Sequence, residues 1–95
     1  DMAFSRDGWN PIGGQSKKGT APQLFSYTTT DAHTDVDGSG YLNAVSDDVA
    51  VGDMVMVRGN TGGTATLTMH VVVSNASGVV DLSDGTVIGG VTAGD

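Results

Sequence analysis

The chain is organised around residues 40–58, where the spacing of apolar positions changes. In the first part of this stretch the apolar residues are Tyr41, Leu42, Val45 and Val49. Their roughly helical spacing predicts a short helical turn. After the tight entry V-G-D at residues 51–53, residues 54–58 predict a strand that is apolar on both faces, because side chains alternate faces along a strand. We expect such a strand to be covered on both sides, by its own domain or by a neighbouring subunit.

Four further segments have strand patterns: residues 23–30, 64–74, 79–82 and 86–91. The turn sequence N-T-G-G at residues 60–63 predicts that the strands on either side of it form an antiparallel hairpin. Residues 30–40 are predicted to be a polar loop. About five short strands with little helix predict a mainly β fold, a small antiparallel β-barrel or sandwich with one short helical turn.

Residues 1–22 have neither a helical nor a strand period and predict an extended N-terminal arm, followed by a single small β domain at residues 23–95. Two interpretations stay open for this arm, a disordered terminus and a docking arm. Phe4, Trp9 and Ile12 are costly to leave in water and suit a groove on a partner. Lys17 and Lys18 add local positive charge. On the docking interpretation, these five residues are the candidate partner-binding residues.

Composition limits the possible functions of the chain. A length of 95 residues allows one small domain, and the absence of cysteine excludes disulfides, so oligomerisation is an expected source of stability. The net charge of −7, with four basic residues, argues against nucleic-acid binding, because phosphate contacts need Lys and Arg. No apolar run has membrane-spanning length, and no signal peptide is visible. Asp1 before Met2 looks like a residue left by an expression tag, so we expect the natural chain to start at Met2.

One loop resembles the start of a calcium-binding loop. Asp35, Asp37 and Ser39 stand at its first, third and fifth positions, and Gly40 stands at the sixth. The twelfth position, where calcium needs a bidentate glutamate, is Ser46. We therefore interpret this segment as a glycine-rich turn.

The sequence contains no clear catalytic constellation. Catalysis by Ser39 would need a histidine base, and nothing in the sequence places His33 or His70 beside it. His33 with the neighbouring aspartates could bind a metal weakly, whereas His70, in the middle of a predicted strand, is expected to be structural or to lie at a subunit contact. We predict no enzyme activity, cofactor or metal site, and rank a hydrolase or metal enzyme last among the hypotheses.

Two segments carry a family resemblance, S-G-Y-L-N-A-V-S-D-D-V-A-V-G-D-M-V-M-V at residues 39–57 and H-V-V-V-S-N-A-S-G-V-V at residues 70–80. Their order resembles small structural proteins of tailed bacteriophages, namely head decoration (cement) or head-fibre-like proteins, over roughly residues 22–91. The resemblance implies a scaffold role for six positions of this sequence and a catalytic role for none. These positions are Tyr41, Leu42, Asn43, Val51, Gly52 and Asp53. At Asp47-Asp48 the chain departs from the pattern, which shortens the expected helical turn.

The resemblance implies a non-enzymatic virion protein that is rich in β structure and commonly trimeric. Such a protein would bind the major capsid protein on the outer surface of the capsid as a homotrimer, with neither nucleic acid nor membrane as a partner. The alternative is a receptor- or glycan-binding module of a tail fibre or spike. That function would need aromatic side chains exposed on a groove, and Trp9, Tyr27 and Tyr41 are the residues available for it.

Overall fold

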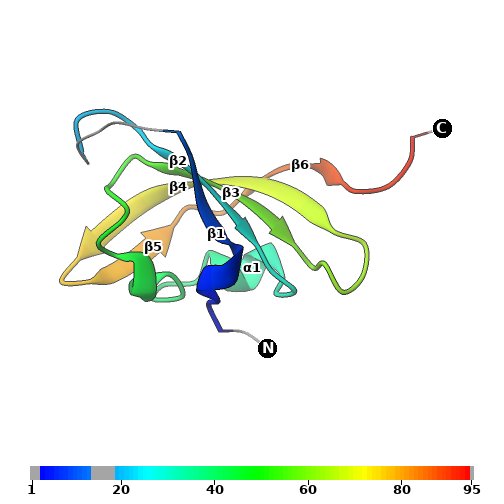
Figure 1. Ribbon diagram of the computed structural model, residues 1–95, viewed down its shortest axis with the longest axis horizontal. Helices are drawn as coiled ribbons and strands as arrows, with labels where there is room; N and C mark the ends of the chain where they lie inside the picture. Colours follow the sequence, from blue (N-terminus) through cyan, green and yellow to red (C-terminus); the bar gives the residue numbers. More distant parts are fainter. Residues whose placement is uncertain (1–2, 14–18, 95) are drawn as a thin grey trace.

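The computed structural model describes residues 3–13 and 19–94, which are built on one six-stranded sheet (Figure 1). Five strands lie in the order β1-β2-β3-β4-β5, and β6 pairs with β4. The strands are β1 (Trp9–Gly13), β2 (Leu24–Thr28), β3 (Met54–Gly59), β4 (Thr66–Ala76), β5 (Val79–Leu82) and β6 (Thr86–Gly90). The predicted mainly β fold is confirmed, and each of the five predicted strands is present.

The neighbours β2 and β3 run parallel, whereas the other strand pairs are antiparallel. A parallel pair needs a long crossover connection, and residues 29–53 supply it. This connection contains the short helix α1 (His33–Val36), within the predicted polar loop, and the 3₁₀ turn η2 (Asn43–Val45). The expected all-antiparallel arrangement is therefore corrected at this one pair. The sheet does not close into a barrel over the described residues, and the crossover forms a second, sandwich-like layer against it (Figure 1).

The hydrophobic core lies between the sheet and the crossover connection. From the crossover come Val36, Leu42, Val45 and Val49, each at most 1% exposed. From the sheet come Phe25, Tyr27, Val55, Val57, Val72, Val80 and Leu82. The predicted helical spacing at residues 41–49 thus places apolar side chains on the inner face of the sheet, although the regular turn itself is only three residues long.

The described part of the predicted arm is packed on the domain. After the 3₁₀ turn η1 (Arg6–Gly8), β1 pairs with β2, with Trp9 opposite Tyr27. Trp9 is only 6% exposed. A Cβ at Gly8 would lie 2.0 Å from the carbonyl oxygen of Thr28, so this close approach requires glycine. Over residues 3–13, the structure therefore has a turn and an edge strand of the sheet where an extended arm was expected.

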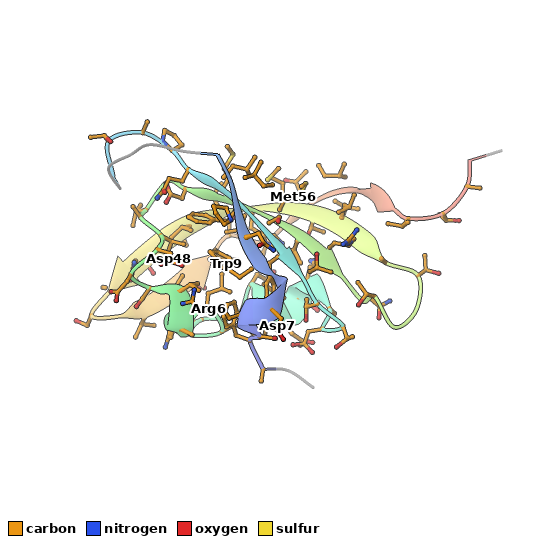
Figure 2. The ribbon with its side chains drawn as sticks, viewed as in Figure 1. Arg6, Asp7, Trp9, Asp48 and Met56 are labelled. Carbon is orange, nitrogen blue, oxygen red and sulfur yellow. The ribbon has the colours of Figure 1, made fainter. Side chains whose placement is uncertain are left out.

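The face of the sheet away from the crossover is only partly covered. Strand alternation and register place its apolar residues side by side, and we define the outer face by Leu24, Met54, Met56, Leu67, Met69 and Val71. Figure 2 shows Met56 on the side of the sheet opposite Trp9. The strand predicted to be apolar on both faces therefore buries Val55 and Val57 within its own domain, whereas Met54 is 36% exposed and Val71 is 40% exposed.

Candidate interaction surface

The structure describes three of the five predicted partner-binding residues: Phe4 and Trp9 pack together, with ring centroids 6.0 Å apart, and Ile12 lies on the surface. Trp9 is buried, and Phe4 is partly buried against Tyr27, with ring centroids 5.1 Å apart. These two aromatic side chains therefore belong to the core of their own chain. Ile12 is 52% exposed and stays available to a partner. Lys17 and Lys18 lie outside the described residues.

The two histidines approach each other, with ring centroids 6.0 Å apart. His70 is fully buried, and both of its ring nitrogens have partners. Nδ1 lies 2.9 Å from the carbonyl oxygen of Ser83 and must donate to it, so in the neutral ring Nε2 accepts from the Thr68 hydroxyl at 2.8 Å. A Cβ at Gly85 would lie 2.6 Å from His70 Cε1, so the imidazole ring packs directly against the backbone at Gly85. The expectation that His70 is structural fits this arrangement.

The calcium-like segment is a hydrogen-bonded turn after α1. The Asp37 amide donates to the His33 carbonyl at 3.0 Å, and the Gly38 amide donates to the Asp35 carbonyl at 3.2 Å. Gly40 has a φ of 89°, and its amide donates to the Val80 carbonyl at 2.9 Å. No group of three or more His, Cys, Asp or Glu residues in the described part of the chain could hold a metal ion.

A partly buried polar cluster joins the N-terminal segment to the crossover. The Tyr41 hydroxyl donates to Asp31 Oδ2 at 2.6 Å and lies 2.9 Å from the Tyr27 hydroxyl, which accepts from the Ser5 amide at 3.0 Å. Burial, followed by the hydrogen bonds to Asp31 and Tyr27, raises the pKa of Tyr41 above its usual range. The phenol therefore stays protonated and serves as a structural donor.

An open cavity of about 470 Å³ lies beside this cluster. It is lined by Ala3, Ser5, Asp7, Gly8, Thr28, Thr29, Thr30, Asp31 and Thr61. Ligand pockets usually enclose a small molecule with apolar and aromatic walls. This wide hollow has no aromatic or large apolar side chain among its lining residues, so it offers little to hold a small ligand.

The V-G-D sequence ends the crossover with a carboxylate that accepts three N–H groups. Asp53 is 1% exposed, and its Oδ1 accepts from the Gln23 amide at 2.9 Å. Its Oδ2 accepts from Gln23 Nε2 at 3.0 Å and from the Ala50 amide at 2.9 Å. Gly52 has a φ of 94°, which favours glycine. These hydrogen bonds therefore connect the end of the crossover to Gln23, the residue that precedes β2.

The outer face carries exposed apolar side chains, among them Met54 and Val71. A groove of about 240 Å³ opens on it. This groove is lined by Ile12, Ser26, Tyr27, Thr28, Met56, Arg58 and Leu67. Strand alternation puts Arg58, and no carboxylate, among the outer-facing positions of β2, β3 and β4. An apolar surface with a polar rim is typical of a site for protein contact.

The sequence predicted part of this surface. Alternation placed Met54 with Met56 on one face of their strand, and Leu67 with Met69 on one face of theirs. The register of β3 and β4 sets Met54 opposite Val71 and Met56 opposite Met69, which joins the two rows.

Comparisons with family models, with curated proteins and with solved structures find no match to this chain. Among the helices of the described residues, none is long and apolar enough to cross a membrane.

Proposed function

We propose that this protein is a non-enzymatic structural component of a bacteriophage virion, which decorates and stabilises the capsid by binding its outer surface as an oligomer. The observation that carries the proposal is the exposed apolar surface on a domain whose core is already complete. The resemblance of residues 39–57 and 70–80 to head decoration proteins supplies the kind of partner, the major capsid protein.

Several large apolar side chains of the described residues are exposed, and some of them lie side by side. Large apolar residues that are at least 36% exposed are Ile12, Val51, Met54, Val71, Val73, Val79, Val87, Ile88 and Val91. Single exposed apolar residues are ordinary, but contiguous ones mark contact sites. On the outer face, Met54 lies opposite Val71 and beside the row of Met56 and Met69, so these side chains form a contiguous patch.

Capsid stabilisation would follow from mass action. A protein that binds the assembled shell and not its separate subunits shifts the equilibrium toward the shell. An oligomer would present several copies of the binding surface together, which raises avidity without any new contact. Lys17, Lys18 and Ile12 remain the candidate capsid-contact residues, whereas Trp9 and Phe4 serve the core.

The glycan-binding alternative has less support. Stacking on a sugar needs an exposed aromatic ring, but Trp9 and Tyr27 are buried, and Tyr41 is partly buried with its hydroxyl bonded to Asp31. Among the described residues, no aromatic side chain belongs to the exposed class. This observation favours capsid decoration over a receptor-binding module.

The test is co-sedimentation of the protein with empty bacteriophage heads, together with the temperature at which the heads disrupt. We expect the protein to pellet with the heads at a saturating ratio and to raise their disruption temperature. The double variant Lys17→Gln/Lys18→Gln should bind less. A control with the same change in net charge, Thr34→Glu/Thr64→Glu, alters two exposed positions and should bind as the natural sequence does. Protein that stays in the supernatant with every head tested would overturn the proposal.

A further inference from the structure

Three methionines gather on the outer face of the sheet. Met54 and Met56 share this face of β3 because side chains two residues apart in a strand point the same way. The register sets Met56, labelled in Figure 2, directly opposite Met69 of β4. Met54 lies opposite Val71, so it is the diagonal neighbour of Met69. These three positions form a triangle across one strand pair, and we call them the methionine triad.

The triad is compact enough for its sulfur atoms to converge on one point. Directly opposite residues of an antiparallel pair have Cβ atoms about 4.5–5.5 Å apart, and diagonal neighbours are about 7–8 Å apart. A methionine side chain is unbranched and has three rotatable bonds, so its sulfur can cover this range. Met54 is 36% exposed, and Met56 and Met69 are half-buried, so an ion can approach from solvent without opening the core.

The chemistry of the triad suits one class of ion. Thioether sulfur is a soft, neutral ligand that selects Cu⁺, whereas Ca²⁺ and Mg²⁺ need oxygen ligands. The outer-facing positions of β2, β3 and β4 contain no carboxylate that would attract a hard divalent ion instead. The chain has no cysteine, so no thiolate elsewhere competes for a soft ion. The donor set therefore favours a soft monovalent cation.

The charges of the chain permit a cation at this place. The net charge of −7 favours the approach of cations over anions. Arg58 shares the outer face of β3, but its guanidinium donates to Thr28 Oγ1 in β2 at 3.4 Å. The Arg58 side chain therefore extends toward β2, on the opposite side of β3 from Met69 in β4.

We propose that Met54, Met56 and Met69 together bind one soft monovalent cation through their thioether sulfurs. Cu⁺ is the biological ion of this class, and Ag⁺ is its air-stable probe. The inference goes beyond the proposed function and does not depend on it, because the ion binds a single copy of the chain without a capsid.

Methionines on a surface also serve as adaptable apolar contacts, and leucine separates that role from metal binding. The exchange of methionine for leucine nearly conserves volume and keeps the surface apolar, but it removes the sulfur. A role in apolar contact alone would survive this exchange, whereas a role as a metal ligand would not.

The first experiment is a calorimetric titration of the protein with silver nitrate in a buffer without chloride. We expect one strongly bound Ag⁺ per chain. Met56→Leu and Met69→Leu should each weaken this binding by at least about tenfold, a loss that is typical even of residues that only support a metal ligand. Met2→Leu makes the same exchange outside the triad and should leave the affinity unchanged. Far-UV circular dichroism checks that each variant is folded.

A second measurement shows which side chains bind the ion. In protein labelled with ¹³C at the methionine methyl groups, the signals of Met54, Met56 and Met69 should shift together and stop shifting at one Ag⁺ per chain. The Met2 signal should stay in place, and Ca²⁺ should move none of the four. Because Ag⁺ also binds imidazole, His33→Gln is the control for a histidine site, and it should give the same titration as the natural sequence.

Three results would overturn the inference. They are an unchanged affinity in the triple variant Met54→Leu/Met56→Leu/Met69→Leu, a Met2 signal that shifts with the other three, and a loss of binding in His33→Gln. The capsid experiment is decided separately, because the triple variant keeps an apolar outer face and should pellet with heads as the natural sequence does. Silver binding without pelleting would overturn capsid decoration alone, and pelleting without silver binding would overturn the metal site alone.

Discussion

Trp9 stacks on Phe25 across the β1–β2 pair, with ring centroids 4.8 Å apart and ring planes 17° apart. The indole Nε1 also donates to Asp48 Oδ2 at 3.2 Å, in the crossover. One side chain thus joins the first strand, the sheet and the covering layer. Removing the N-terminal segment would open the core, so single substitutions test the function of this segment better than a truncation does.

The first prediction concerns this contact. Trp9→Ala should lower the free energy of unfolding by about 3–5 kcal/mol, because it removes a large buried ring and leaves a cavity. Asn10→Ala, at an exposed position in the same strand, should change it by no more than about 0.5 kcal/mol. Urea denaturation followed by far-UV circular dichroism measures both variants. Equal midpoints for the two would show that Trp9 is not part of the core in solution.

The second prediction concerns the carboxylate of the V-G-D sequence. Asp53→Asn places an amide NH₂ group against N–H donors from Gln23 or Ala50, so at least one buried donor loses its acceptor. The expected loss is about 2–3 kcal/mol. In a domain of this size, that lowers the Tm by roughly 8 °C or more. Asp84→Asn, at an exposed position, is the control, and scanning calorimetry would show an unchanged Tm for both if the Asp53 network contributed nothing.

The third prediction concerns alkaline pH. The pKa of Tyr41 is raised in the folded chain above its unfolded value of about 10, so the unfolded chain loses the phenol proton first as the pH rises. The stability that the protonated phenol contributes is therefore complete below about pH 10 and is lost as the pH rises above it. Urea midpoints measured between pH 9 and pH 11.5 should fall less steeply in Tyr41→Phe. Parallel pH profiles for the two proteins would contradict this prediction.

The fourth prediction concerns the turn between β4 and β5. Ser77 has a φ of 54° and Gly78 has a φ of 79°, which fits a two-residue type I′ turn. Asn tolerates this backbone conformation better than Ser does, so Ser77→Asn should raise the free energy of unfolding by about 0.5–1 kcal/mol. Ser77→Val places a β-branched residue there and should lower it. Chemical denaturation of both variants checks the opposite signs, and a shift in the same direction would contradict the turn assignment.

Strand positions were predictable because alternation records which side chains share a face. Alternation does not record which strand lies next to which, so the parallel β2–β3 pair was not predictable from it. The first strand was not predicted because Pro11 and Gly13 interrupt its pattern. Its place in the sheet depends on a close approach at Gly8 and on the stacking of Trp9 on Phe25, contacts between residues far apart in the sequence.

The candidate surface was predictable only in part for a related reason. Large apolar residues in a segment without a period, such as Phe4 and Trp9, suggest binding to a groove on a partner. The hydrophobic core of the same domain can bury such residues equally well. Ile12 comes from the same segment and is exposed. The sequence also indicated that residues 54–58 were apolar on both faces, but only the path of the crossover decides which face stays open.

The parallel pairing of β2 with β3 also determines when the chain can fold during its synthesis. Residues 9–28 leave the ribosome first, yet β2 bonds to a strand that follows a long crossover, and that strand bonds in turn to β4. Contacts between segments distant in sequence form slowly, because a loop must close before they do. Phe25 and Tyr27 can contact Trp9 and Phe4 early, but they reach their full burial only after the crossover and β3 have been made.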